Sequence, residues 1–262
     1  MSYRSRLFII LWIAGIAGVV SLLLVDLSAL IAMIPVDPGQ SPAELPSPTV
    51  LKIVSLIQPA ILVSLAVLIG VLLANRIGLH SPAAEAAAAG DGVVSKLRPQ
   101  LMPAIIAGTA GGIAIVLIWI IAKPYLPADF IMRAEGFNSL LPAPVRFLYG
   151  GLTEEILLRW GLMTILVWIP WRLIQKGEGS PKHLFIVAAI LISALLFGAG
   201  HLPVASMLAG QLTLPLVAYV IAANSIFGIA AGFLYWKRGL ESAMIAHMVA
   251  HIVLIVAITF SL

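Results

Sequence analysis

The sequence contains no cysteine, and only 10% of its residues are charged, whereas 61% belong to the hydrophobic set. The absence of cysteine excludes disulfides, thiolate metal ligands and a cysteine nucleophile. Soluble domains use roughly 45–50% apolar residues, so this composition indicates a polytopic membrane protein. No soluble stretch is long enough for a second domain, and we expect residues 1–262 to form a single integral membrane domain.

Long apolar runs dominate the chain. A helix needs about 20 mostly apolar residues to cross the hydrocarbon core of a bilayer. Seven segments meet this requirement: 7–34, 50–75, 101–123, 147–169, 184–202, 214–236 and 241–261. We therefore predict an all-α, polytopic transmembrane helix bundle of about seven to eight helices.

Two connecting segments differ from the apolar runs. The Ala- and Gly-rich segment 81–99 is expected to be mobile or loosely helical. Segment 127–141 mixes charged and aromatic residues, and we expect it to lie in the membrane interface as a short helix.

The basic residues lie mostly in the short connections between apolar runs, where they orient a membrane protein, so the net charge of +4 indicates no nucleic-acid partner. With a cytoplasmic N-terminus, ten of them fall in the inside loops and four in the outside loops. The inside set is Arg4, Arg6, Arg76, Lys96, Arg98, Arg172, Lys176, Lys182, Lys237 and Arg238, and the outside set is Lys52, Lys123, Arg133 and Arg146. We therefore expect a multi-pass protein of a prokaryotic cell membrane with its N-terminus in the cytoplasm.

Glycines occur at helix-packing spacings in two apolar runs. Gly108, Gly111 and Gly112 lie in one run, and Gly228 and Gly232 lie at GxxxG spacing in another. We expect these glycines to mark close contacts between helices.

The stretch "GGLTEEILLRWGLM", residues 150–163, places three ionisable groups in an apolar run. Each costs about 2.5–3.5 kcal/mol at the bilayer centre, so their clustering needs a common reason. On a helix, Glu155 and Arg159 share a face at i,i+4 spacing and can pair, whereas Glu154 points about 100° away, towards Gly150 and Gly151. Either Glu154 is a proton acceptor, or all three groups form a polar staple between helices.

Three further polar side chains lie in the later apolar runs. His201 ends "LLFGAGHLP", one turn after Phe197, and His247 and His251 share one face of the last helix in "AMIAHMVAH". We expect these histidines and the glutamate pair to converge on one polar cavity. The predicted boundaries place His201 almost at the outer end of its helix and His247 about 10 Å from the inner boundary, so tilt or boundary shifts must bring them level.

These residues resemble the motifs of a known family. "EEILLR" is similar to EExxxR, "FGAGH" to FxxxH and "HMVAH" to HxxxN/D of the CAAX protease and bacteriocin-processing (abortive infection) family, which includes the type II CAAX prenyl proteases. The resemblance implies an intramembrane glutamate-type endopeptidase that acts, without a metal cofactor, on a membrane-embedded or lipidated peptide or protein in the lipid bilayer.

The resemblance also implies roles for individual residues. Glu154 and His201 would activate the attacking water, and His247 and His251 would stabilise the oxyanion. Glu155, Arg159 and Phe197 would support the site.

One position departs from the family pattern, because His251 stands where Asn or Asp is usual. A histidine can donate a hydrogen bond as Asn does. The change also leaves zinc open as an alternative, with His201, His247, His251 and Glu154 as ligands. Two other functions stay open: a proton-coupled transporter or channel, and a catalytically silent scaffold of the same fold.

Overall fold

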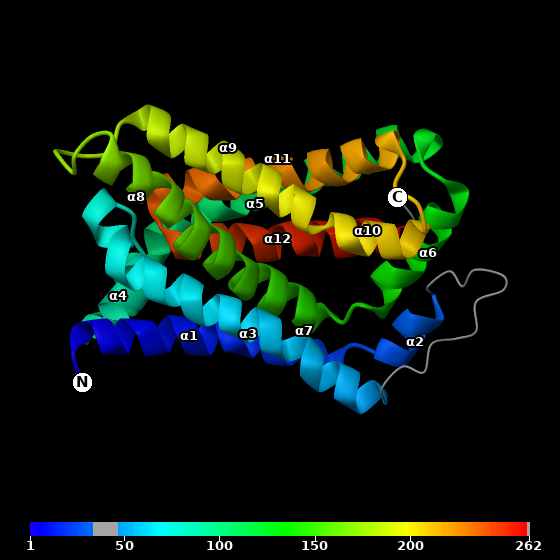
Figure 1. Ribbon diagram of the computed structural model, residues 1–262, viewed down its shortest axis with the longest axis horizontal. Coiled ribbons are helices and arrows are strands. Elements are labelled where there is room, and N and C mark those ends of the chain that lie inside the picture. The colour runs from blue at the N-terminus through cyan, green and yellow to red at the C-terminus, as the bar shows by residue number, and fades with distance from the viewer. Residues whose placement is uncertain (34–46, 261–262) are drawn as a thin grey trace.

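The computed structural model describes residues 1–33 and 47–260, which form a bundle of long helices lying side by side along one axis (Figure 1). Seven segments are long and apolar enough to cross a membrane: Tyr3–Leu24, Thr49–Ile77, Val93–Tyr125, Ala143–Leu173, His183–Ala209, Leu214–Arg238 and Leu240–Thr259. The predicted all-α, multi-pass architecture is confirmed. Residues 34 and 261, where two predicted segments end, lie outside the described part of the chain.

The helices follow one another with short connections. In chain order they are α1 Tyr3–Ser21, η1 Leu22–Leu24, α2 Leu27–Ala32, α3 Pro48–Leu73, η2 Ala74–Ile77, α4 Pro82–Ala89, α5 Val93–Ala122, η3 Lys123–Tyr125, α6 Ala128–Leu140, α7 Ala143–Val145, η4 Arg146–Glu154, η5 Ile156–Met163, α8 Thr164–Leu173, α9 His183–Gly200, α10 Leu202–Ala209, α11 Leu214–Arg238 and α12 Leu240–Thr259. The N-terminus and α4 lie at one end of the bundle, while α2, α6 and α10 lie at the other (Figure 1).

The first spanning segment is shorter than predicted. It ends at Leu24 rather than at residue 34, because the backbone is extended at Val25 and a separate helix, α2, begins after it. Asp26 caps α2 by accepting a hydrogen bond from the Ala29 backbone N–H at 3.1 Å. A short acidic side chain stabilises a helix start in this way, and it breaks a long apolar run into two helices.

Segment 81–99, expected to be mobile or loosely helical, contains the ordered helix α4 and the start of α5. Four alanines of α4 are buried. Glu241, at the start of α12, accepts hydrogen bonds from the Ser81 hydroxyl at 2.6 Å and from the Ala84 backbone N–H at 2.9 Å. The carboxylate thereby satisfies unpaired donors at the start of α4 and fastens this helix to the bundle.

Glycines allow several helices to approach closely, as predicted. A side chain at Gly108 of α5 would collide with the Ala246 carbonyl of α12, and one at Gly228 of α11 would reach Ala194 of α9 at 3.0 Å. Gly239 has a positive φ of 117° and joins α11 to α12 through a single residue. That conformation favours glycine, and it sets α12 directly against α11.

The fourth span departs from α-helical geometry, because both η4 and η5 are π-helical. In a π-helix the backbone hydrogen bonds run from residue i to residue i+5, so residues four and five apart fall close to one face. Such segments are rare and occur often at functional sites.

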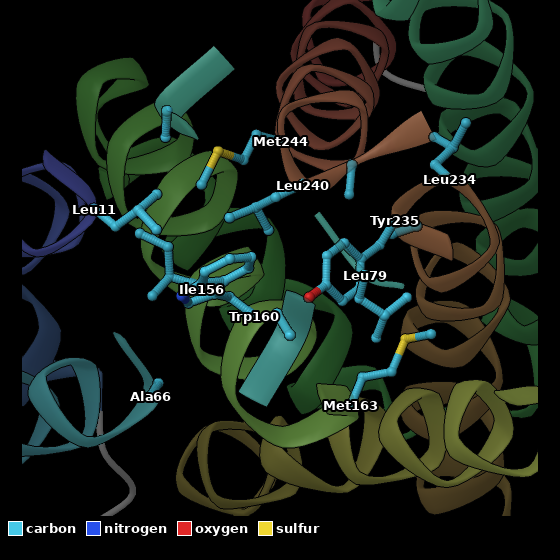
Figure 2. Close-up of a cluster of buried hydrophobic side chains, with 14 of the residues drawn as sticks. Leu11, Ala66, Leu79, Ile156, Trp160, Met163, Leu234, Tyr235, Leu240 and Met244 are labelled. Carbon is cyan, nitrogen blue, oxygen red and sulfur yellow. The ribbon is translucent and has the colours of Figure 1, made fainter. Parts of the chain in front are cut away.

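A buried apolar cluster holds η5 in place (Figure 2). Trp160 packs edge-on against Tyr235 of α11, with the ring centroids 6.4 Å apart, and both side chains are almost fully buried. The Tyr235 hydroxyl hydrogen-bonds the Thr164 hydroxyl at 2.8 Å. Since lipid tails are as apolar as these side chains, van der Waals packing and hydrogen bonds of this kind hold the helices together. The cluster therefore fixes the rotation of the helix that carries the ionisable residues.

Candidate active site

The second glutamate of the fourth span forms a buried ion pair. Glu155 Oε2 lies 3.1 Å from Arg159 Nε, and neither side chain is exposed. Arg159 also donates from Nη2 to the Gly228 carbonyl of α11 at 3.0 Å. The i,i+4 pairing predicted from the sequence is confirmed. The pair joins the fourth span to α11, as a polar staple would.

His247 of α12 contacts both glutamates. Its Nδ1 lies 2.7 Å from Glu155 Oε1, within hydrogen-bond distance, and its Nε2 lies 3.8 Å from Glu154 Oε2. A carboxylate accepts hydrogen bonds, so His247 Nδ1 carries a hydrogen and donates the hydrogen bond to Glu155. The 3.8 Å separation is too long for a direct hydrogen bond, and it leaves Glu154 available to a water that contacts both groups.

His251 lies one turn further along α12 and stacks on His247, with centroids 4.9 Å apart and planes 14° apart. A Cβ at Gly150 would lie 2.6 Å from His251 Nε2, so the absence of a side chain there makes room for the ring. The space cleared by Gly150 is thus filled by His251, and Met248 fills the space beside Gly151. His251 Nδ1 is buried without a hydrogen-bond partner among the described residues.

His201 follows the last residue of α9, and Phe197 connects it to the other residues. His201 Nδ1 donates to the Phe197 carbonyl at 2.8 Å, because a carbonyl can only accept. In the neutral ring this leaves the lone pair on Nε2, which is the form that a base requires. The Phe197 ring packs edge-on against His201 at 4.8 Å and His247 at 5.9 Å, measured between centroids.

The two glutamates differ in access. The side chain of Glu154 is 21% exposed, whereas that of Glu155 is fully buried. His201 is half-buried. Glu154 and His201 can therefore meet water or a substrate, while Glu155 and Arg159 can act only through the residues they hold.

Comparison with protein-family models gives one assignment. Residues 136–253 match the family described as type II CAAX prenyl endopeptidase Rce1-like. The matched region covers less than half of the chain. Comparison with curated proteins and with solved structures gave no match.

The matched region begins within α6 and ends within α12, so it includes all three sequence motifs. The spanning segments before α6, which contribute α1, α3 and α5, pack around it: α1 and α3 contact the π-helical segments, and α5 lies against α11 and α12. They are part of the same bundle.

The sequence placed His201 and His247 at different depths in the membrane. This difference arises because the end of the fifth span was predicted too early. The fifth span does not end at residue 202 but continues through α10 to Ala209. Pro203 lies in the first turn of α10, where proline is tolerated, so it starts a helix instead of ending the span. His201 accordingly lies eight residues inside the end of its span, which is about 12 Å at the helical rise.

Two further residues of the matched region were not recognised in the sequence as candidate site residues. Arg146, assigned to an outside loop, is buried at the start of η4, and Phe227 packs on His247 with centroids 4.6 Å apart. The spacing of Arg146 four residues before Gly150 and eight before Glu154 was a usable signal. Phe227 lies in an ordinary apolar run, and nothing in the sequence marks it.

The zinc alternative requires histidine and carboxylate side chains placed around one metal position. Within residues 1–33 and 47–260, no group of three or more His, Asp or Glu side chains is placed to hold a metal ion. Nδ1 of His247 is occupied by Glu155. Zinc dependence thus has no preformed ligand set in this arrangement, and metal content of active protein is the measurement that decides it.

Proposed function

We propose that this protein hydrolyses a peptide bond of a membrane-associated or lipidated peptide by means of a water activated by Glu154 and His201. The proposal rests on a contact between η4 and α12. The partly exposed Glu154 lies 3.8 Å from His247, and His247 is itself held by Glu155. The separation supports the proposal, because a general base must lie within direct or one-water reach of the proton it takes.

In the first step, Glu154 takes a proton from water, helped by the free Nε2 of His201, and the hydroxide oxygen bonds to the scissile carbonyl carbon. The carbonyl π bond breaks, and its electron pair moves to the oxygen. The partial burial of the site strengthens each of these electrostatic contacts.

His247 and His251 would donate hydrogen bonds to that oxygen as it becomes negative. Because His247 already donates from Nδ1 to Glu155, donation from Nε2 requires a ring that carries protons on both nitrogens. Among the described residues, the buried Nδ1 of His251 has no hydrogen-bond partner, so it would supply the second donor. Each donor of this kind contributes about 100-fold to 1000-fold in rate.

In the second step, the C–N bond breaks, the carbonyl re-forms, and the proton held by Glu154 passes to the departing amine. Glu155, Arg159 and Phe197 take no direct part. They fix the rotation of His247 and the position of His201. The products are a carboxylic acid and an amine, and the balance needs no metal or cofactor.

The experiment uses purified protein in lipid nanodiscs with a library of lipidated and unmodified peptides, read by mass spectrometry. Cleavage is expected for the natural chain and lost in Glu154→Ala and His201→Ala, while Glu135→Ala, which removes an exposed carboxylate paired with Lys123, should cleave normally. Proton flux in liposomes without cleavage would instead indicate a transporter, and neither activity would indicate a silent scaffold.

We also propose that the N-terminus faces the cytoplasm of a prokaryotic cell and that no nucleic acid is bound. With the buried Arg146 left out, ten basic residues in the inside connections against three in the outside connections support this orientation. Because the chain lacks cysteine, single cysteines at Ser5 and Ser139 would report the side directly. Labelling of Ser5→Cys by an impermeant reagent in intact cells would contradict the orientation.

A further inference from the structure

An open cavity of about 440 Å³ lies between the ends of α1, α4, α5 and α11. These helix ends belong to the end of the bundle that holds the N-terminus, opposite to α6 and α10 (Figure 1). Gly239, which lines the cavity, precedes His247 by eight residues, or about 12 Å at the helical rise. The cavity is therefore separate from the candidate active site, and its volume is within the range of pockets that hold small ligands.

Three cations line this cavity. They are Lys96 of α5 and the two residues that end α11, Lys237 and Arg238, and all three are exposed to solvent. Among the described residues, no carboxylate lies within ion-pair distance of any of them. Their positive charges are thus available to a ligand.

The carboxylates of the lining do not balance these cations. Glu85 is already engaged, because it accepts a hydrogen bond from the Ser81 backbone N–H at 3.1 Å and lies 3.4 Å from His80 Nδ1. The other carboxylate in the lining is Asp91, just after α4. Three cations therefore face one remaining carboxylate, and the excess positive charge favours an anionic ligand.

The cavity lies at the depth where lipid headgroups meet the hydrocarbon core. Tyr3 begins the first spanning segment and Arg238 ends the sixth. Tyrosine and tryptophan are enriched at this depth of a membrane, and Tyr3 and Trp236 both line the cavity. Basic pockets between transmembrane helices bind lipid headgroups in the same setting.

Lys237 makes the cavity unsuitable for a quaternary ammonium headgroup. Its Nζ lies over the Trp236 ring, 3.4 Å from the ring centroid. A choline group would bind to such a ring face through a cation–π contact, but Lys237 already occupies this face. The aromatic side chain therefore holds a cation of the protein instead of receiving one from the ligand.

We propose that the cavity lined by Lys96, Lys237 and Arg238 binds the phosphate group of an anionic ligand, which an anionic phospholipid of the surrounding leaflet supplies. A soluble phosphate compound carries the same chemistry and is the alternative source. A headgroup held between α1, α4, α5 and α11 would join these helix ends and stabilise the bundle. The site does not depend on the proposed peptidase function.

The test measures lipid binding to the purified protein in detergent by native mass spectrometry. Phosphatidylglycerol, which has a net negative charge, is compared with phosphatidylcholine that carries the same acyl chains. Each Lys or Arg beside an anionic headgroup increases the affinity about fivefold, so three should favour phosphatidylglycerol by roughly 100-fold. Glycerol 3-phosphate should bind far more weakly than phosphatidylglycerol; equally tight binding would contradict a lipid source and assign the cavity to a soluble phosphate.

Three variants connect the preference to the cavity. Lys96→Gln/Arg238→Gln removes two charges and should weaken phosphatidylglycerol binding about 25-fold without affecting phosphatidylcholine. Ala89→Trp keeps every charge but fills the cavity, because Ala89 is part of the lining, and it should also weaken binding. Lys182→Gln is the matched control, since Lys182 is an exposed lysine on the same predicted side of the membrane but outside the lining. It should bind phosphatidylglycerol as the natural protein does.

Several outcomes would overturn the inference. Equal affinities of the natural protein for the two lipids would leave the three cations only their role in orienting the chain. A full preference in the double variant would place the lipid elsewhere. A loss in the double variant without a loss in Ala89→Trp would indicate attraction to surface charge rather than binding in the cavity. All the replaced residues are exposed, so melting temperatures without lipid should stay within a few degrees of the natural value.

Discussion

Glu155 is the residue whose replacement tests the buried network most sharply. In Glu155→Gln the shape is kept, but the carboxylate that faces both His247 and Arg159 loses its charge. A glutamine has only one acceptor oxygen, so it can receive a hydrogen bond from one of these partners and must turn its NH₂ group towards the other. One of the two contacts is lost in either orientation.

The expected magnitude follows from the complete burial of the pair. Glu155 and Arg159 are both 0% exposed and lie 3.1 Å apart, so removing one charge leaves the other unpaired in a low dielectric. Breaking such a pair destabilises a protein by about 3–5 kcal/mol. Loss of the 2.7 Å contact also releases His247, and the loss of one oxyanion donor lowers kcat by about 100-fold to 1000-fold.

The assay combines unfolding in mixed detergent micelles with peptide cleavage in nanodiscs. The double variant Glu155→Gln/Arg159→Gln removes both charges and should recover at least half of the lost stability, without recovering activity. Glu241→Gln is the matched control, since Glu241 also accepts several hydrogen bonds but lies far from the site, at the end of the bundle with α4. It should lose stability and keep kcat. Additive effects of the two site substitutions on stability would refute the buried ion pair.

Three further predictions concern single positions. Gly150→Ala would place a methyl group 2.6 Å from His251 Nε2, and the displaced ring should lower kcat/KM about 100-fold, measured on the best peptide, while the unfolding free energy changes by less than about 3 kcal/mol. His251→Asn, which keeps a donor, should retain kcat within about tenfold, whereas His251→Ala should lose at least 100-fold; loss of bound zinc together with activity in His251→Asn would contradict the metal-free mechanism. The hydrogen bond that His80 donates to Glu85 raises the pKa of His80 above its ordinary value of 6.5, so this contact stabilises the fold fully below pH 6.5 and loses that effect as pH rises through the raised pKa. The melting temperature should fall by at most a few degrees over that range, and the fall should be absent in His80→Gln.

Spacing along one helix was enough to predict part of the site. Glu155 and Arg159 pair because residues four apart share a face, and His247 and His251 stack for the same reason. These contacts depend only on local geometry. The seven spans were predictable for an equally simple reason, because long apolar runs must cross the bilayer as helices.

Contacts between distant spans could not be predicted in the same way. That His247 Nδ1 meets Glu155 rather than Glu154 depends on the rotation of α12 against η4, which many packed side chains determine together. The π-helical turns have no distinct composition, so the sequence does not show that the fourth span departs from α-helical geometry. The ends of two spans were wrong because Asp26 and Pro203 act through local capping, which apolar run length does not detect.

The most direct test of the account is the rate of peptide cleavage by Glu154→Gln, because this substitution keeps the shape of the side chain and removes only its ability to accept a proton from water. With the same peptide in the same nanodiscs, kcat should fall by about 100-fold to 10,000-fold while the unfolding free energy stays within about 1 kcal/mol of the natural protein. A kcat within tenfold of the natural value would show that Glu154 does not activate the water, and the proposed mechanism would be wrong.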